Sequence, residues 1–377
     1  MTQSAPPAAD LTLQRSSRDA SDVPARLAGW LGGVLPPGAD PEVVLRTGVD
    51  ANGMSSETLV LDVTWSEGGR RRTGAYVARV APSAADVPVF ARYDLGAQHQ
   101  AMRLVAERTE VPVPGVHWIE PTGQVLGAPF FLMDRLEGRV PPDVLPYPFG
   151  DNWLFDATPE EQRHLQDRTV ETVAALHAVP DAASAFAFLD PGGEGASVLR
   201  RDLARTRAWY EFAKADAGPS PTVERALAWL ESHEPASATG TVLCWGDARI
   251  GNVLYDGFEP AGVLDWEMAT LGPRELDVSW LLVAHQVFQS IVEVLELPGM
   301  PDFLREDDVL ATYERASGVR LGDLDWYHVH SALQWSIVFM RTGSRQVHFG
   351  EIDRPDDIES LMHNLPLLLT TMERVGA

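Results

Sequence analysis

The sequence predicts an α+β protein in which a small antiparallel sheet region is followed by a larger, mostly helical region. Between about residues 40 and 137, short apolar runs alternate with Gly-rich turns. From about residue 140 onward, long stretches with apolar residues near helical spacing replace them. The 377 residues, with 45% hydrophobic content, are enough to bury a large core in roughly two or three domain-sized units.

Four apolar runs predict the strands of the first region, and one helix interrupts them. The runs read TLVLDVTW, GAYVARV, GVHWIE and PFFLMDRL, with turns such as SEGGRRR between them. Leu95, Met102 and Val105 lie near helical spacing, so we expect a helix over roughly 89–108. A proline-rich connection, EGRVPPDVLPYPFGDNW, then leads into predicted helices that include EEQRHLQDRTVETVAALHAV, VLRRDLARTRAWYEFAK and TVERALAWLESH.

The composition narrows the classes of partner and location. The formal net charge of -24 argues against a nucleic-acid partner and, weakly, against an anionic membrane. Surplus carboxylates usually serve solubility, and attraction of a cationic substrate is the less common alternative. Cys244 is the only cysteine, which excludes intramolecular disulfides and cysteine-based metal sites. The chain contains neither a secretory signal nor an apolar run of ~20 residues, so we expect a cytoplasmic protein with a loose arm over residues 1–21.

Polar residues interrupt one of the most apolar stretches, CWGDARIGNVLYDG followed by AGVLDWE. NVLYDG and AGVLDW predict two antiparallel strands joined by a turn that contains Asp256, Gly257 and Pro260. Because paired strands lie about 4.8 Å apart, this hairpin brings Asn252 beside Asp265. Amide and carboxylate oxygens are the ligands that Mg²⁺ prefers, so the hairpin predicts a magnesium site.

The loop before this hairpin contains a second signal. Asp247 precedes Asn252 by five residues, which is the spacing of the protein-kinase catalytic loop, where the aspartate accepts a hydroxyl proton and the asparagine binds metal. Asp247 and Asp265 as simple turn caps are the alternative, which the combined spacing disfavours. Arg249 is either a cation for the transferred phosphoryl group or a solvent-facing side chain. Glu267, two residues after Asp265, points either to the same site or to the surface.

The two-part motif WGDARIGNVLYDG and VLDWEMATLGPRELDVSWL resembles the phosphotransferase family that includes aminoglycoside phosphotransferases, choline kinases and kinase-like domains attached to some acyl-CoA dehydrogenases. The resemblance extends from about residue 40 and is nearest to the acyl-CoA-dehydrogenase-associated and uncharacterised branches. It implies a protein-kinase-like fold in which two lobes grip ATP. We therefore expect a flexible arm over 1–21, an N-lobe over 22–137 and a C-lobe over 138–377.

The same resemblance implies roles for individual residues. Asp247 would be the catalytic base, Asn252 and Asp265 would bind magnesium, and Asp277 would be a buried acid that braces the catalytic loop. On the third strand, Arg79 would pair with nucleotide phosphates.

Two further stretches correspond to nucleotide-binding segments of the family. NGMSSET matches the turn that covers the phosphates, although a plain hairpin turn would look the same; its candidate residues are Gly53, Ser55, Ser56 and Thr58. FFLMDRLEG resembles the segment that joins the lobes, so we expect Met133 and Arg135 to line the adenine edge.

Three positions depart from the family pattern. The third strand carries Arg79 instead of lysine, and the only lysine, Lys214, lies in the helical half. The helix stretch AQHQAMR lacks the acid that usually holds the third-strand cation, so the predicted partner is Gln100 or, with a shifted alignment, Glu107. Trp245 replaces a histidine that braces the loop, and we expect it to change packing rather than chemistry.

The sequence thus favours an ATP-dependent phosphotransferase with Mg²⁺, with GTP as the alternative nucleotide, that transfers a phosphoryl group to a hydroxyl of a small molecule. The branch that the chain resembles disfavours a sugar-amine antibiotic as acceptor. We expect a monomer or a homodimer. A catalytically silent kinase-like protein that binds nucleotide or a partner is the alternative. Four aromatic residues of the connection predict either a lid over the acceptor or simple packing: Tyr147, Phe149, Trp153 and Phe155.

Overall fold

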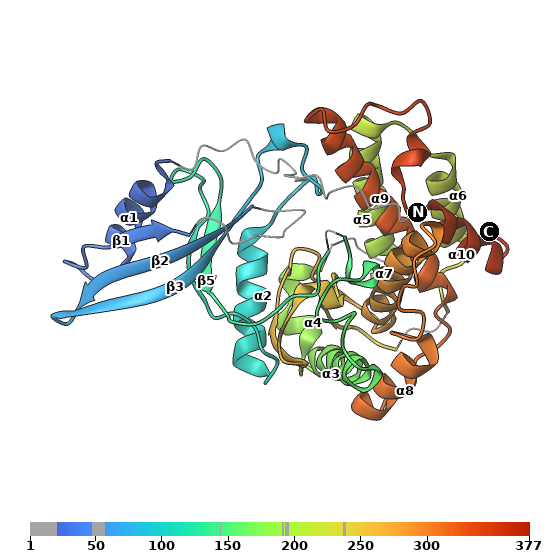
Figure 1. Cartoon of the computed structure of the whole chain (residues 1–377), viewed down its shortest axis with the longest axis horizontal. Helices are drawn as coiled ribbons and strands as arrows, with labels where there is room; N and C mark the ends of the chain where they lie inside the picture. Colours follow the sequence, from blue (N-terminus) through green and yellow to red (C-terminus); the bar gives the residue numbers. More distant parts are fainter. Residues whose placement is uncertain (1–20, 47–56, 144, 191, 193–195, 237–238) are drawn as a thin grey trace, which may run out of the picture.

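The computed structural model describes residues 21–46, 57–143, 145–190, 192, 196–236 and 239–377. Figure 1 shows two parts joined by a connection near residue 138, a sheet lobe and a helical lobe. The predicted α+β fold, with an antiparallel sheet preceding a helical region, is confirmed. No helix in the described part of the chain is long and apolar enough to cross a membrane.

The sheet lobe is built on five antiparallel strands in the order β1-β2-β3-β5-β4. The strands are β1 (Glu42–Leu45), β2 (Glu57–Glu67), β3 (Arg70–Val80), β4 (Val116–Glu120) and β5 (Phe130–Asp134). Gly68 and Gly69 form the two-residue turn between β2 and β3, and both have positive φ, which the right-handed twist of the hairpin favours. In this register Arg79 on β3 lies opposite Thr58 on one side and Phe131 on the other.

Two helices accompany the sheet, α1 (Val23–Val34) and α2 (Leu95–Arg108), and α2 lies between the sheet and the helical lobe (Figure 1). The predicted helix over 89–108 is therefore six residues too long at its start. The side chain of Asp94 accepts a hydrogen bond from the Ala97 N–H at 3.0 Å, and this N-cap fixes the beginning of α2 at Leu95.

The helical lobe packs around two long buried helices. It contains α3 (Pro159–His177), α4 (Ala182–Ala185), α5 (Val198–Ala217), α6 (Pro221–Ser232), α7 (Glu275–Val294), α8 (Glu306–Ser317), α9 (Asp325–His348) and α10 (Leu365–Arg374). Helices α7 and α9 pack together, and the rings of Trp280 and Trp335 stack between them at 5.4 Å. Predicted helices correspond to α3, α5 and α6.

Short strands pair within the helical lobe. β6 (Val242–Cys244) pairs with β9 (Thr270–Gly272), and β7 (Val253–Asp256) pairs with β8 (Glu259–Val263). The β7–β8 pair is the predicted hairpin. Pro260, however, lies within β8 rather than in the turn, because Gly257 with φ +60° closes the turn earlier. Pro260 faces Tyr255 at a shift in register, where its lack of an N–H is tolerated.

Candidate active site

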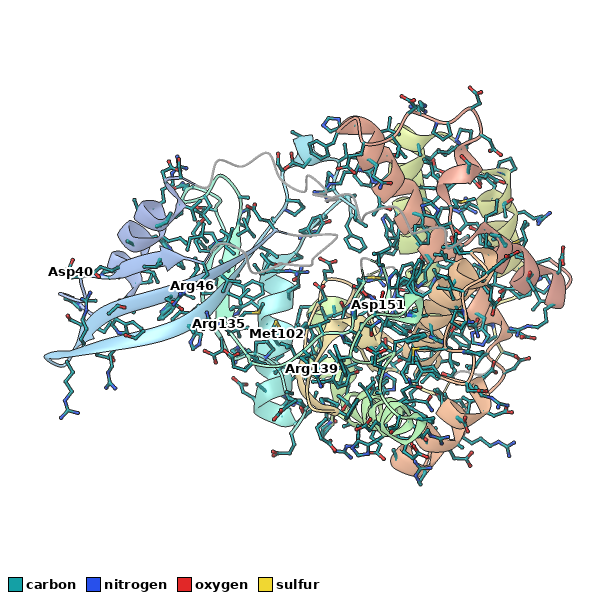
Figure 2. The ribbon with its side chains drawn as sticks, in the orientation of Figure 1. Asp40, Arg46, Met102, Arg135, Arg139 and Asp151 are labelled. Carbon is teal, nitrogen blue, oxygen red and sulfur yellow. The ribbon has the colours of Figure 1, made fainter. Side chains whose placement is uncertain are left out.

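A cleft of about 640 Å³ lies between the two lobes. Its walls come from β2, β3, α2, the connection over 133–143 and the β7–β8 hairpin. Figure 2 shows Met102 of α2 and Arg135 of the connection where the lobes meet, and both line the cleft. The lining includes these predicted site residues: Thr58, Arg79, Met133, Arg135, Asn252 and Asp265. The other predicted residues of the phosphate-covering turn, Gly53, Ser55 and Ser56, lie outside the described residues.

Asp277 of α7 fixes the backbone of the loop that follows β6. One carboxylate oxygen of Asp277 accepts the Trp245 N–H at 2.7 Å, and the other accepts the Gly246 N–H at 2.8 Å. The Nε2 atom of His177 lies 3.0 Å from the same carboxylate. Asp277 is fully buried, so these partners compensate for its desolvation. This geometry agrees with the expected bracing role.

Gly246 makes the sharp bend that leads into Asp247. Its φ is +87°, and a Cβ at this position would collide with the carbonyl oxygen of Met268. Only glycine fits both the backbone conformation and the space. The bend leads directly into Asp247, which is buried behind Asn252 and, like Arg249, is not among the residues that line the cleft.

Trp245 joins this loop to the segment after the hairpin. Its indole Nε1–H donates to the carbonyl oxygens of Leu264 and Asp265 at 2.8 and 3.1 Å. Because both contacts are to backbone, the residue positions two loops relative to each other.

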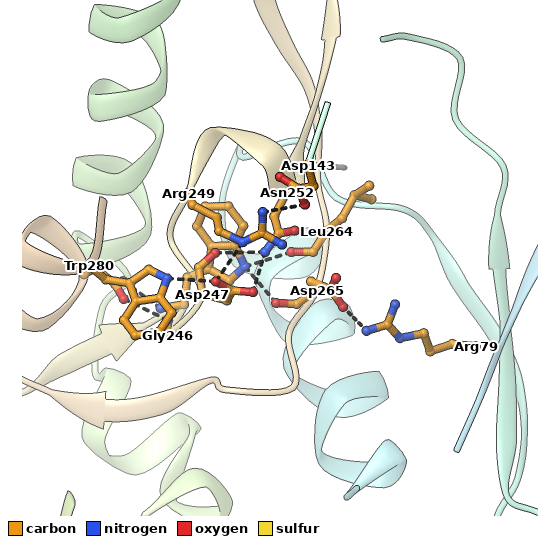
Figure 3. Close-up of polar contacts among 11 residues, drawn as sticks. Arg79, Asp143, Gly246, Asp247, Arg249, Asn252, Leu264, Asp265 and Trp280 are labelled. Carbon is orange, nitrogen blue, oxygen red and sulfur yellow. Dashed lines mark hydrogen bonds and ion pairs between the residues drawn. The ribbon is translucent and has the colours of Figure 1, made fainter. Parts of the chain in front are cut away.

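Three donors surround the carboxylate of Asp247 (Figure 3). Its Oδ1 accepts from the Trp280 Nε1–H at 2.8 Å and from the Arg249 Nε–H at 3.1 Å. Its Oδ2 accepts from the Asn252 Nδ2–H at 2.6 Å. These contacts fix the orientation of a buried acid next to the cleft.

The hairpin places Asn252 and Asp265 together, as predicted. Asn252 immediately precedes β7, and its carbonyl oxygen accepts the Leu264 N–H at 2.9 Å, one residue before Asp265. The Asn252 Nδ2 atom is engaged by Asp247, so its side-chain oxygen is turned away from that acid. Asp265 has φ +57°, a left-handed conformation that is uncommon for residues other than glycine.

Arg79 lies on the opposite lobe and contacts Asp265 across the cleft, as Figure 3 shows. Its Nη2 donates to Asp265 Oδ1 and, at 3.1 Å, to Glu267 Oε2. Both predicted helix partners are wrong: Gln100 is exposed, and Glu107 pairs with Arg103 at 2.6 Å on the exposed face of α2.

The turn of α2 that lines the cleft contributes Gln98 and Met102, and neither is acidic. A buried guanidinium is stable only when its charge is paired, and helix α2 offers no acid to Arg79. The two acids after β8 supply the negative charge. Glu267 thus points toward the site rather than to the surface.

Arg249 is buried, so its solvent-facing alternative is wrong. Its Nη1 donates to Asp143 Oδ2 at 2.6 Å, and its Nε donates to Asp247. Burial alone would lower the pKa of Arg249, but the charges of Asp143 and Asp247 raise this pKa above its ordinary value. The arginine is therefore a permanent cation held between two carboxylates.

Asp143 is a residue of the site that no sequence pattern indicated. It lies in the proline-rich connection, and its side chain is 6% exposed at the wall of the cleft. Its Oδ1 is buried without a hydrogen-bond partner among the described residues and lies against Gly251, where a Cβ would collide with it. An acid directly after two prolines in PPDV was the available signal, but nothing in its spacing tied it to Arg249.

The connection forms the remaining wall. Met133 lies on β5 opposite Val77, and the Arg135 N–H donates to the Ala75 carbonyl at 3.1 Å. Arg139 then bonds through its backbone to Tyr255 of the hairpin, with both N···O distances at 2.9 Å, and lies between the lobes in Figure 2. The predicted nucleotide-edge segment therefore runs along the cleft.

The aromatic residues of the connection pack instead of covering the cleft. Tyr147 is buried and its hydroxyl lies 2.8 Å from His285 Nδ1. Trp153 lies beneath the guanidinium of Arg139 at 4.3 Å and near the ring of Tyr255. Neither they nor Phe149 and Phe155 are among the residues that line the cleft.

One buried cluster contains groups of the kind that bind metals. Ligand atoms of His177, Cys244 and Asp277 lie within 4.8 Å of one another. Each is engaged: His177 also contacts the Tyr313 hydroxyl at 2.7 Å, and the Cys244 thiol lies 3.4 Å from a carbonyl. Burial raises the pKa of the Cys244 thiol well above its usual value, which disfavours the thiolate that a metal requires. The cluster is a hydrogen-bonded support for the loop that follows β6.

Comparison with known families gives the motif its context. The pattern of the phosphotransferase enzyme family, APH, matches residues 60–320, more than half of the chain. The chain belongs to the phosphotransferase enzyme family. The match contains both halves of the hairpin motif and the third strand with Arg79.

A curated relative is the probable acyl-CoA dehydrogenase IBR3 of Arabidopsis thaliana, which is 28% identical over 242 residues. The match covers 61% of this chain and 28% of that protein, so it spans about a quarter of the relative's length.

Solved structures share the fold at low sequence identity. A Ralstonia eutropha protein provisionally assigned as an aminoglycoside phosphotransferase matches with a TM-score of 0.65 and 20% identity, over 93% of this chain and 98% of its own. An ethanolamine kinase of Plasmodium vivax gives 0.58 and 10%, over 92% and 88%. The GDP complex of aminoglycoside 2'-phosphotransferase-IIIa gives 0.52 and 15%, over 93% and 99%.

Proposed function

We propose that the protein transfers the γ-phosphoryl group of ATP to a hydroxyl of a small molecule, with GTP as the alternative nucleotide. One observation carries the proposal: Asp247, Asn252 and Asp265 converge beside the inter-lobe cleft with Arg79 opposite them. Family membership supports a phosphotransferase reaction. The GDP complex of a structural neighbour supports nucleotide binding by this fold.

The nucleotide would lie along the connection and under the strand hairpin. The backbone near Met133 and Arg135 is suited to the adenine edge, because it lines the cleft wall. Thr58 and Arg79 are partners in the register of β2 and β3 and both line the cleft, which supports a role for the guanidinium in binding phosphate oxygens. The predicted contributions of Gly53, Ser55 and Ser56 remain part of this proposal.

The donor set beside Asp247 fits a magnesium ion. Asn252 and Asp265 both line the cleft and offer an amide oxygen and a carboxylate, which are hard oxygen ligands. The guanidinium of Arg79 forms an ion pair with the Asp265 carboxylate. When bound, Mg²⁺ would neutralise charge that develops on the phosphate oxygens.

Asp247 is proposed as the base that orients the acceptor hydroxyl and takes its proton. Its contacts with Trp280, Arg249 and Asn252 hold one carboxylate geometry before substrate arrives. Arg249 is proposed to stabilise the transferred phosphoryl group, and Asp143 holds that guanidinium from its other side.

Calorimetric titration with ATP, with and without Mg²⁺, tests nucleotide binding first. Acceptors are then sought by screening hydroxylated metabolites with γ-labelled ATP, with Asp247→Asn as the matched inactive control. Metal-dependent ATP binding and label transfer that the control lacks would support the proposal. Binding without transfer to any acceptor, and without ADP formation, would favour the catalytically silent alternative. A cytoplasmic location and a monomeric or homodimeric state remain predictions.

A further inference from the structure

We infer that the segment over residues 81–94, which we call the strap, is a second tether between the two lobes. Its hydrogen bonds to Trp209 and Arg341 hold the cleft at one opening and so position Arg79, which lies just before the strap on β3. Trp209 and Arg341 are therefore positioning residues for the nucleotide site. The inference goes beyond the proposed function and uses its nucleotide only as a probe.

The strap begins and ends in the sheet lobe. It follows β3, where the Ala81 N–H donates to the Pro129 carbonyl oxygen at 3.0 Å, and it ends at Asp94, the N-cap of α2. Between these two points the strap leaves its own lobe and lies against α5 and α9 of the helical lobe (Figure 1). The lobes are therefore joined here as well as by the connection over 133–143.

Arg341 of α9 binds the strap at Pro88. Its Nε and Nη2 atoms both donate to the Pro88 carbonyl oxygen, at 2.9 and 2.7 Å. Its Nη1 pairs with Asp216 of α5, and its guanidinium carbon lies 4.0 Å from the ring centre of Phe212. The arginine side chain is 1% exposed, so its desolvation must be compensated by hydrogen bonds. Two of these bonds go to one carbonyl oxygen of the strap, which makes this contact a strong one.

Trp209 of α5 binds the strap one residue further on. Its Nε1–H donates to the Val89 carbonyl oxygen at 2.8 Å, and its ring lies 4.8 Å from the ring of Phe90. Val87 has φ +49°, a left-handed conformation that is rare for a β-branched residue. Such a conformation persists only where the surrounding structure fixes it. Trp209 and the arginine of α9 provide that support from the helical lobe.

The two crossings contact different parts of the helical lobe. The connection bonds to the β7–β8 hairpin through Arg139 and Tyr255, whereas the strap bonds to α5 and α9. Lobes that are joined at a single crossing can rotate about it, and a second crossing opposes that rotation. Opening of the cleft requires the strap to lose its bonds to the helical lobe. The strap therefore sets the separation of the lobes and the place of Arg79 in the cleft.

The first test replaces Arg341 with methionine, which keeps an apolar stem and removes the donors. We expect hydrogen exchange at the amides of Asp86 and Phe90, which are hydrogen-bonded within the strap, to rise about ten-fold or more. Amides of α7, in the core of the helical lobe, should change by less than about two-fold. An effect confined to the strap is not expected of a residue that only stabilises the helical lobe.

Small-angle X-ray scattering and calorimetry measure the effect on the cleft. The radius of gyration of the wild-type protein should be the same with and without MgATP. Arg341→Met should have a larger radius without nucleotide and should contract when MgATP binds. Its MgATP affinity should be about five-fold weaker, because only part of the variant population has the lobes close together.

A matched pair of tryptophan variants controls for loss of stability. The Trp326 Nε1–H donates to the Leu230 carbonyl oxygen at 3.0 Å within the helical lobe, so Trp326→Phe and Trp209→Phe each remove one indole hydrogen bond to a backbone carbonyl. Thermal unfolding should shift by a similar amount in both. Only Trp209→Phe should raise exchange in the strap, by about five-fold for one lost hydrogen bond. Should Arg341→Met fail to fold, this pair decides the inference.

Several results would overturn the inference. Unchanged exchange in the strap of Arg341→Met, or an equal rise in α7, would show that the arginine does not fasten the strap. A wild-type protein that contracts on MgATP binding as much as the variant would show that the strap does not hold the cleft. A variant with faster exchange in the strap and wild-type MgATP affinity would refute the positioning of Arg79. A wild-type protein that does not bind MgATP would refute the proposed function alone, since exchange and scattering of the nucleotide-free proteins still test the strap.

Discussion

Replacing Asp247 with asparagine separates chemistry from nucleotide binding. The carboxylate accepts hydrogen bonds from Trp280 at 2.8 Å, Arg249 at 3.1 Å and Asn252 at 2.6 Å. An asparagine amide has one oxygen, so at least one of these donors must face an N–H group. We expect the free energy of unfolding to fall by about 1–3 kcal/mol, the usual cost of an unsatisfied buried donor.

The effect on function should be larger and more selective. Asp247 does not contact Arg79, so MgATP affinity should stay close to that of the wild type. Phosphoryl transfer should fall by about 10²–10⁴-fold, because proton transfer from the acceptor is lost. Calorimetry measures the affinity, and labelled ATP with an acceptor from the screen, or basal ADP formation, measures the turnover.

Two outcomes would refute this reasoning. Wild-type turnover in a folded Asp247→Asn protein would show that the acid is only a turn cap. A loss of MgATP affinity comparable to the loss of turnover would show that Asp247 contributes to nucleotide binding instead of proton transfer. Chemical denaturation of the same preparations controls for the loss of stability.

Four further substitutions have specific expected effects on nucleotide binding, turnover or stability. Asp265→Asn should abolish transfer and also remove the Mg²⁺-dependent part of ATP affinity, which titrations with and without the metal measure. Arg79→Ala should weaken MgATP binding by about ten-fold or more, and an unchanged dissociation constant would count against its phosphate role. Asp143→Asn should lower turnover with little change in MgATP affinity, because Arg249 loses its 2.6 Å partner; equal loss of both would contradict this. Burial lowers the pKa of His285 to about 4, so the folded protein resists its protonation and stability should fall by about 2 kcal/mol between pH 7 and 5; denaturation of His285→Gln at both pH values should show a smaller fall.

Local sequence signals predicted much of the catalytic half of the site. The hairpin needed only two apolar runs and a turn, so the juxtaposition of Asn252 and Asp265 followed from strand pairing. The separation of Asp247 from Asn252 lies within one loop, and their side chains meet at 2.6 Å. A separation this short limits how far apart the two side chains can lie, because few backbone dihedral angles lie between them.

Contacts between distant segments were not accessible in the same way. Glu267 is 188 positions from Arg79 in sequence, and Asp143 is 106 positions from Arg249. Which acid contacts a buried cation depends on how the two lobes pack. The hydrophobic periodicity of the sequence does not predict that packing. The predicted start of α2 was wrong for a different reason. The N-cap at Asp94 begins the helix at Leu95, although the apolar pattern continues upstream of it.

Helix α7 supports the loop around Asp247 at two points separated by one turn. Asp277 holds the backbone at Trp245 and Gly246, and Trp280 holds the Asp247 carboxylate. Positions three apart lie on the same face of a helix, so one rigid body sets both the course of the loop and the direction of its acid. During evolution, loops around the cleft can therefore change in length and composition while the Asp247 carboxylate stays in place. Specificity for a new acceptor would then arise from substitutions around the cleft, as long as Asp277 and Trp280 are both retained.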